Sequence, residues 1–157
     1  MDTARTRESE NKALVRRWFE EVWNQGREEL IEELRAPDAV GFGLGETSVP
    51  VQGASGFKVF YRNLRSALPD LHVTVEHLVA EEDMVAARIQ VEGTHMGPGL
   101  GVPPTGQSVL FSGMLIARMS GGRIAESWNN LDQLGLLRQV GALPSAAGPD
   151  RFLAKRG

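Results

Sequence analysis

The hydrophobic pattern changes its period once, near Pro69 and Asp70, and this change constrains the fold more than any other feature. Before it, apolar residues recur every three or four positions, as on one face of an amphipathic helix. After it, they alternate with polar residues, as in strands that bury one face. Helices followed by a run of strands predict an α+β domain with a curved sheet.

The first half of the chain predicts three helices. Residues 10–24 and 53–68 each carry an apolar stripe, and a shorter helix covers 27–35 and ends before Pro37. The glycine-rich residues 41–50 predict a short strand with loops.

The second half predicts four strands. They cover residues 71–79, 85–91, 107–119 and 123–132, and residues 133–140 form a closing helical turn. Mostly short connections between long strands predict an antiparallel meander. The glycine- and proline-rich residues 97–106 are expected to be an irregular loop.

One domain is expected, flanked by two ends. Residues 1–9 are predicted to be a flexible leader, 10–141 the domain, and 142–157 a loose tail. A chain of 157 residues is long enough for one hydrophobic core and short for two.

The composition excludes several classes of function. The absence of cysteine removes disulfides, thiolate metal sites and cysteine nucleophiles. A net charge of −3 argues against nucleic acid as a partner, because phosphate binding needs clustered positive charge. No apolar run approaches the roughly 20 residues of a membrane span, and no signal peptide is evident, so we expect a cytoplasmic protein without a membrane partner.

The histidines and serines do not form known catalytic or metal-binding patterns. The chain has no HxH or HExxH spacing and no GxSxG setting. We therefore expect no metal, and chemistry carried by oxygen and nitrogen side chains alone.

Asp132 is the strongest candidate for a general base. It follows the alternating residues of the last strand on the same parity as Trp128, if no bulge intervenes. A carboxylate held against an indole on the concave face of the sheet would be desolvated, which favours proton abstraction near neutral pH. The alternative is that Asp132 caps the following helical turn. The two interpretations are compatible.

His95, Arg88 and Arg118 are the other polar candidates. His95 ends a strand on the parity of buried residues, and its alternative is a buried histidine held by a backbone group. The two arginines interrupt apolar strands and could hold a substrate oxyanion or orient a carboxylate. Their alternative is a place on the solvent or dimer face.

The aromatic residues of the first helix are core residues by default. They line a ligand pocket only if that helix covers a cavity. We expect substrate contacts from a set of mostly apolar side chains: Trp18, Phe19, Phe60, Met114, Arg118, Trp128 and Asn130.

Six segments, in their order and spacing, resemble the SnoaL-like polyketide cyclases (ester cyclases) of the NTF2-like superfamily. They are NKALVRRWFEEVWNQG, LPDLHVTVEHLVAEEDMVAAR, EGTHMG, GVPPTG, FSGMLIARMSGGRIAESW and NNLDQLGLLRQVG. The resemblance covers about residues 10–141. It implies an NTF2-like cone, in which a strongly curved antiparallel sheet wraps around the N-terminal helices and encloses an apolar pocket.

The resemblance also implies a reaction that needs no cofactor, and a site. An aspartate in the family's W-x-x-x-D position, here Trp128 and Asp132, is the acid/base residue of an intramolecular aldol closure of a polyketide ester, as in antibiotic biosynthesis. A histidine of the preceding strand assists it in the family, but residues 107–119 contain none. His95 or Arg88 is the expected substitute, and Phe19 falls where the family's first helix contributes an aromatic residue to the pocket.

Other functions remain open on the same fold. An epoxide hydrolase would use Asp132 with Arg88, an isomerase would need an oxyanion donor, and a binding domain would only sequester an apolar ligand. Apolar residues on both parities of 107–119 favour a covered outer face of the sheet, so we expect a homodimer.

Overall fold

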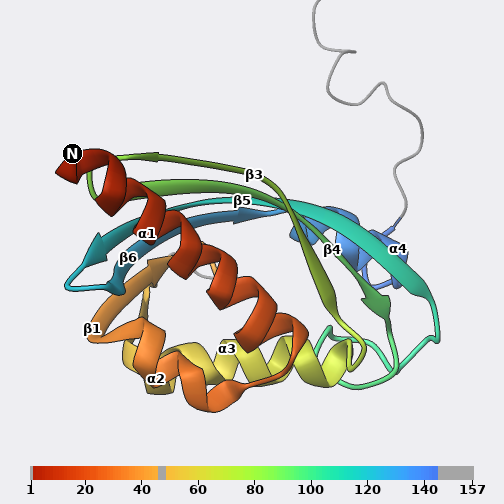
Figure 1. Cartoon of the computed structure of the whole chain (residues 1–157). Helices are drawn as coiled ribbons and strands as arrows, with labels where there is room; N and C mark the ends of the chain where they lie inside the picture. The colour runs from red at the N-terminus through yellow and green to blue at the C-terminus, as the bar shows by residue number, and fades with distance from the viewer. Residues whose placement is uncertain (1, 46–48, 145–157) are drawn as a thin grey trace, which may run out of the picture.

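The computed structural model describes residues 2–45 and 49–144. A six-stranded sheet curves over α3, with α1 running obliquely down in front of it and α4 at its far end (Figure 1). This is the α+β architecture expected from the change of hydrophobic period, and the sheet does not close into a barrel. Most of the predicted tail, residues 145–157, lies outside the described residues.

The first helix is longer than its apolar stripe predicts. It comprises α1 (Thr3–Arg17) and a π-helical continuation, η1 (Trp18–Asn24). Asp2 begins it by accepting a hydrogen bond from the backbone N–H of Ala4. The predicted flexible leader is therefore helical from Thr3, although its side chains are mostly exposed.

The second predicted helix is shorter than expected and ends before Arg35. A 3₁₀ turn, η2 (Glu28–Leu30), leads into α2 (Ile31–Leu34), and β1 (Arg35–Phe42) follows directly. The cause is Pro37, which disfavours helix in the residues just before it. The short β2 (Val51–Gln52) then leads into α3, whose bounds, Gly53–Ala67, match the prediction closely.

The four long strands lie where the alternating pattern places them. They are β3 (His72–Glu81), β4 (Met84–Thr94), β5 (Ser108–Ser120) and β6 (Arg123–Leu131), and α4 (Gln133–Gln139) follows. The strand order is β2-β1-β6-β5-β4-β3. The meander from β3 to β6 is antiparallel as predicted, but β1 pairs with β6 in parallel, so the sheet is mixed.

A β-bulge in β6 reverses the facing of its residues. Arg118 pairs with Glu126 but Met119 pairs with Ile124, so Ala125 is the extra residue. Ile124 is buried, yet beyond the bulge it is Ser127 that is buried and Trp128 that is exposed. Beyond the bulge, the residues of β6 that face the helices are therefore the odd-numbered ones, whereas an unbulged strand would have kept the even-numbered ones inside.

No described helix is both long and apolar enough to cross a membrane.

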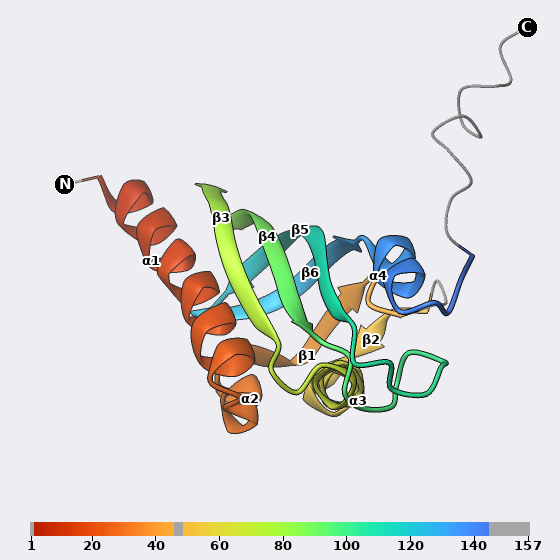
Figure 2. The same cartoon turned by 90° about the vertical axis from the view of Figure 1, so that its right-hand side faces the viewer.

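The core lies between the concave face of the sheet and the helices η1, α2 and α3. In Figure 2, α3 is seen nearly end-on below β3, β4 and β5, while α1 lies to the left of β3 and α4 to the right of β5. This arrangement leaves the interior of the cone between α3, η1 and the sheet.

Candidate functional site

The interior of the cone contains a small apolar cavity, here called the inner cavity. Its volume is about 50 Å³. Aromatic residues of η1 and α3 form one side and aliphatic residues of the sheet the other; the lining side chains include Trp18, Phe19, Trp23, Phe57, Phe60, Val73, Ile89, Val91, Phe111, Leu115 and Leu131. The amide of Asn129 is its polar lining group.

A larger space adjoins it toward α4, here called the outer cavity. Its volume is about 300 Å³, and its walls include Leu136 and Leu137 of α4 and Leu100 of the 97–106 loop. The two cavities share five wall residues: Leu44, Phe60, Leu64, Phe111 and Leu131. Only these five side chains therefore need to lie between the outer cavity and the inner one.

A third space, here called the arginine cavity, adjoins the inner cavity on its other side. Its volume is about 30 Å³, and Arg35 and Ser127 contribute its polar groups together with Asn129. Four residues line both it and the inner cavity: Trp18, Phe57, Leu115 and Asn129. The three spaces thus follow one another through the cone, from mainly apolar walls to a cationic end.

Arg35 is the most deeply buried charged residue among those described, at 2% exposure. Its Nε and Nη2 atoms have no hydrogen-bond partner within the described residues. Its Cζ lies 5.0 Å from the ring centroid of Phe57, a cation–π contact. Burial lowers the pKa of Arg35 to about 10, so the guanidinium is still charged at neutral pH.

The π-helical segment directs the aromatic residues into the cone. Because a π-turn holds more residues than an α-turn, residues four and five positions apart stack on one face, and Trp18, Phe19, Val22 and Trp23 are all buried. Side chains of α3 satisfy the backbone carbonyls of this segment. The Tyr61 hydroxyl donates to Val22 O over 2.8 Å, and the Arg65 guanidinium donates to Trp23 O.

Asn24 fastens the end of η1 to the edge of the sheet. Its Nδ2 donates to Val73 O over 2.9 Å, and its Oδ1 accepts from Val73 N over 2.7 Å. Gly26 then takes a positive φ of 71°, as its place after the helix predicts. The wall of the inner cavity is therefore fixed at one end by α3 and at the other by β3.

Asn129 and Ser127 form a polar pair on the concave face of β6. Asn129 Nδ2 donates to Phe42 O over 2.9 Å and to Ser127 Oγ over 3.1 Å. Both amide protons are thus used, and Oδ1 forms no hydrogen bond within the described residues. The Ser127 hydroxyl accepts from Asn129 and keeps its own proton for a further acceptor.

Among the predicted substrate-contact residues, three aromatic ones line the cavities. Trp18 and Phe19 line the inner cavity, and Phe60 lines both it and the outer cavity. Trp18 and Trp23 pack against Phe57 with ring centroids 5.0 Å and 6.1 Å apart. The same rings therefore fill the core and bound the cavity.

The other predicted contact residues lie on the outer face of the sheet. Met114 and Trp128 are 52% and 37% exposed, and Asn130 pairs with Met114 in the register. Arg118 binds Glu126 across the strands, with Nε 3.0 Å from Oε1. The bulge of β6 turns Trp128 and Asn130 outward, and the even-numbered residues of β5 face the same way.

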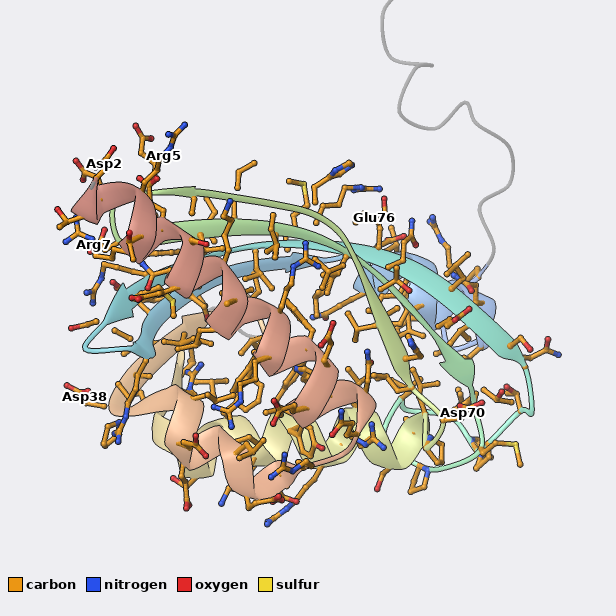
Figure 3. All side chains as sticks on the ribbon, in the orientation of Figure 1. Asp2, Arg5, Arg7, Asp38, Asp70 and Glu76 are labelled. Atoms are coloured by element: carbon orange, nitrogen blue, oxygen red, sulfur yellow. The ribbon has the colours of Figure 1, made fainter. Side chains whose placement is uncertain are left out.

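Arg88 also lies on the outer face. Its Nε is 3.5 Å from Oε2 of Glu76, which points away from the helices in Figure 3. Arg88 and Arg118 therefore both lie on the outer face of the sheet, which was the alternative to a role in substrate binding. Neither lines a described cavity.

Asp132 begins α4 as an N-cap. Its Oδ1 accepts from the backbone N–H of Gly135 over 2.9 Å, and the carboxylate is exposed rather than held against Trp128. This geometry is the second interpretation given for Asp132, in which its carboxylate caps the following helical turn. The residues on either side of it, Leu131 and Gln133, line the outer cavity, so Asp132 lies at the rim of that cavity rather than in its wall.

His95 is fully buried and holds the loop that follows β4. Its Nδ1 accepts from Thr105 N over 3.2 Å and lies 2.9 Å from Thr105 Oγ1. An accepting Nδ1 places the ring proton on Nε2, which has no partner within the described residues. Among the described residues, His95 has no hydrogen bond with Asp132 and lines none of the three cavities.

Within residues 2–45 and 49–144, no three acidic or histidine side chains lie close enough together to hold a metal ion. The charged, amide and hydroxyl side chains that line the inner and arginine cavities are Arg35, Asn129 and Ser127, none of which was a predicted site residue. Arg35 was missed because it was assigned to the end of a helix. The available signal was Pro37, since a helix usually ends at or before the residue that precedes a proline, here Ala36.

Comparison with known proteins identifies the family that shares this fold. The sequence profile of the SnoaL-like polyketide cyclases matches residues 13–140. None of the curated proteins compared with the chain matches it.

Several solved structures are similar to this chain over most of their length. AclR from Streptomyces galilaeus, a proposed hydroxylase, is 33% identical with a TM-score of 0.78, covering 94% of this chain and 89% of its own. IdmH from Streptomyces antibioticus, a proposed polyketide cyclase, is 30% identical with a TM-score of 0.73, covering 83% and 98%. A proposed SnoaL-like polyketide cyclase from Jannaschia sp. CCS1 is 28% identical with a TM-score of 0.78, covering 87% and 95%.

Proposed function

This chain belongs to the SnoaL-like polyketide cyclase family, and we propose that it binds an apolar polyketide-type small molecule inside the cone and promotes its ring closure. The observation that carries the proposal is the series of adjoining cavities between η1, α3 and the concave face of the sheet. An apolar enclosure with few polar groups is typical of small-molecule sites. Its main contribution to the reaction is to hold two ends of one molecule together.

In this proposal Asp132 removes the proton that starts an intramolecular aldol reaction. It takes a proton from a carbon between two carbonyl groups, the resulting carbanion attacks a second carbonyl of the same molecule, and the proton is returned to the new alkoxide. Oδ1 of Asp132 is engaged by Gly135 N, and Oδ2 forms no hydrogen bond within the described residues. The reacting carbon would then lie at the mouth of the outer cavity, beside the start of α4.

The reaction class is tested by following the mass and the carbon skeleton of a product. We expect a linear polyketide ester incubated with the protein to yield a product of unchanged mass that contains a new carbon–carbon bond by NMR. Epoxide hydrolysis would instead add the mass of one water to an epoxide substrate. An isomerised product without a new ring would contradict the aldol proposal, and a hydrated one would support the hydrolase.

Binding without catalysis is the second candidate function. The exposed, helix-capping position of Asp132 favours it, because no other acidic side chain and no histidine of the described residues lines the inner cavity. Under this alternative, the linear ester binds and raises the melting temperature, yet no product forms. The two candidates share the cavities and differ only in turnover.

We also propose a homodimer formed through the outer face of the sheet. Leu110, Met114, Ile116 and Trp128 form an exposed apolar patch there, and Phe42 stacks on Trp128 with ring centroids 6.2 Å apart. Three of these residues adjoin one another, since Ile116 and Trp128 are cross-strand neighbours and Met114 precedes Ile116 on the same face of β5. Contiguous exposed apolar surface of this kind is typical of an interaction site.

Ile116→Lys is expected to convert the dimer into a monomer, because it places a charge at the centre of the apolar patch. Sedimentation velocity measures the change directly. Val59→Lys is the matched control, since Val59 is 61% exposed but lies on α3, away from the patch. A wild-type monomer at high micromolar concentration, or an Ile116→Lys dimer, would reject this interface.

A further inference from the structure

The buried guanidinium of Arg35 lies at the end of the cavity series away from the outer cavity and has no anionic partner among the described residues. No ion pair involves it among the described residues, and two of its three nitrogen atoms have no hydrogen bond. A buried charge without a counter-ion is strongly unfavourable unless something else supplies the opposite charge. An interior cation therefore points to a ligand that brings an anion with it.

The surroundings of Arg35 leave room for such a group. Gly41 lies beside it, and a Cβ there would approach both Arg35 Nη2 and Ser127 Oγ to 3.3 Å, so a larger residue would crowd the polar groups. The arginine cavity of about 30 Å³ is roughly two to three times the minimum space of a single water molecule. That is the scale of the two oxygen atoms of a carboxylate.

The donors also match a carboxylate. A guanidinium presents N–H groups in a planar fork that pairs with two oxygens at once. The Ser127 hydroxyl accepts from Asn129 and keeps a proton for a further acceptor. The contact with Phe57 holds the guanidinium plane in place without neutralising its charge.

We propose that Arg35 binds the carboxylate of an elongated apolar ligand whose body extends through the inner cavity into the outer one. The ligand class is thus an acid with a slender apolar chain and a bulkier end at the mouth. This rests on the proposed function, since it names the class of small molecule that the cone takes. It concerns binding only and holds whether or not the chain turns the ligand over.

The test compares 5-phenylpentanoate with its neutral amide by calorimetry in a chloride-free buffer. The slender chain suits the inner cavity and the phenyl ring the outer one. We expect the acid to bind wild-type protein about 10- to 100-fold more tightly than the amide, the range expected of hydrogen bonds to a charged group. Equal affinities, or a preference for the amide, would overturn the proposal without any variant being needed.

Arg35→Met removes the charge and keeps a long apolar side chain. We expect the preference to reverse in favour of the amide, because a carboxylate then loses its hydration without gaining a partner. The unliganded variant should melt above wild type, since an unpaired buried charge has been removed. Arg123→Met, at an exposed arginine at the start of β6, is the control and should keep the wild-type preference for the acid.

Two further outcomes separate the possibilities. If sodium chloride alone raises the melting temperature of wild-type protein but not of Arg35→Met, and the acid shows no preference, the site is one for small inorganic anions and the proposal is wrong. If wild-type protein binds the acid more tightly than the amide but turns over no polyketide ester, the carboxylate site is supported and the proposed cyclisation is wrong.

Discussion

Asp132→Asn is expected to lower the turnover of a linear polyketide ester by about 10²- to 10⁴-fold, the usual contribution of a general base. The substitution isolates proton transfer from structure, because asparagine caps a helix about as well as aspartate and can still accept from Gly135 N. The loss of the charge at the start of α4 should cost only about 0.3–1 kcal/mol of stability. Product formation and thermal unfolding are measured on the same preparation.

Two comparison variants make the result specific to this carboxylate. Asp38→Asn removes an exposed carboxylate of β1, on the part of the molecule opposite α4 in Figure 3, and should leave turnover unchanged. Asp132→Ala should lose both turnover and the cap, with a destabilisation of about 0.5–2 kcal/mol. Wild-type turnover in Asp132→Asn would reject Asp132 as the base and leave the cap as its whole role.

The order and type of the elements followed from the sequence because periodicity reports which residues share a buried face. Val85, Ala87, Ile89 and Val91 alternate in β4 and are buried as expected. The helix α3 likewise follows its apolar stripe. These patterns are local, so a wrong assignment in one part of the chain does not change the assignment of another.

The candidate site was less predictable because its polar residues depend on non-local pairing. The bulge at Ala125 moves Trp128 from the concave to the outer face and brings Asn129 inside in its place. The parallel pairing of β1 with β6 brings Arg35 beside Ile124 and Gly41 beside Ser127. Neither feature has a signature within a few residues of sequence, so the interior polar groups were found only in the folded chain.

The pairing of β1 with β6 also produces the closest backbone approach relevant to the site. Gly43 follows β1 with a φ of 76°, and a Cβ on it would lie 2.0 Å from the backbone oxygen of Asn129. Such an overlap cannot be relieved by a side-chain rotation, because the obstructing atom belongs to the backbone. Leu44, the next residue, lines both the inner and the outer cavity, so a shift here would reach the binding site.

Gly43→Ala is therefore expected to destabilise the fold by about 4 kcal/mol or more, in the range reached only by severe packing defects. Gly101→Ala is the matched control, because Gly101 has a φ of 78° with no atom within 4 Å of an added Cβ. It should lose only about 1–2 kcal/mol for the left-handed backbone of alanine. Urea unfolding of both variants measures the difference, which isolates the steric contact from the backbone strain common to both. Equal midpoints would show that residue 43 does not approach Asn129 this closely in solution.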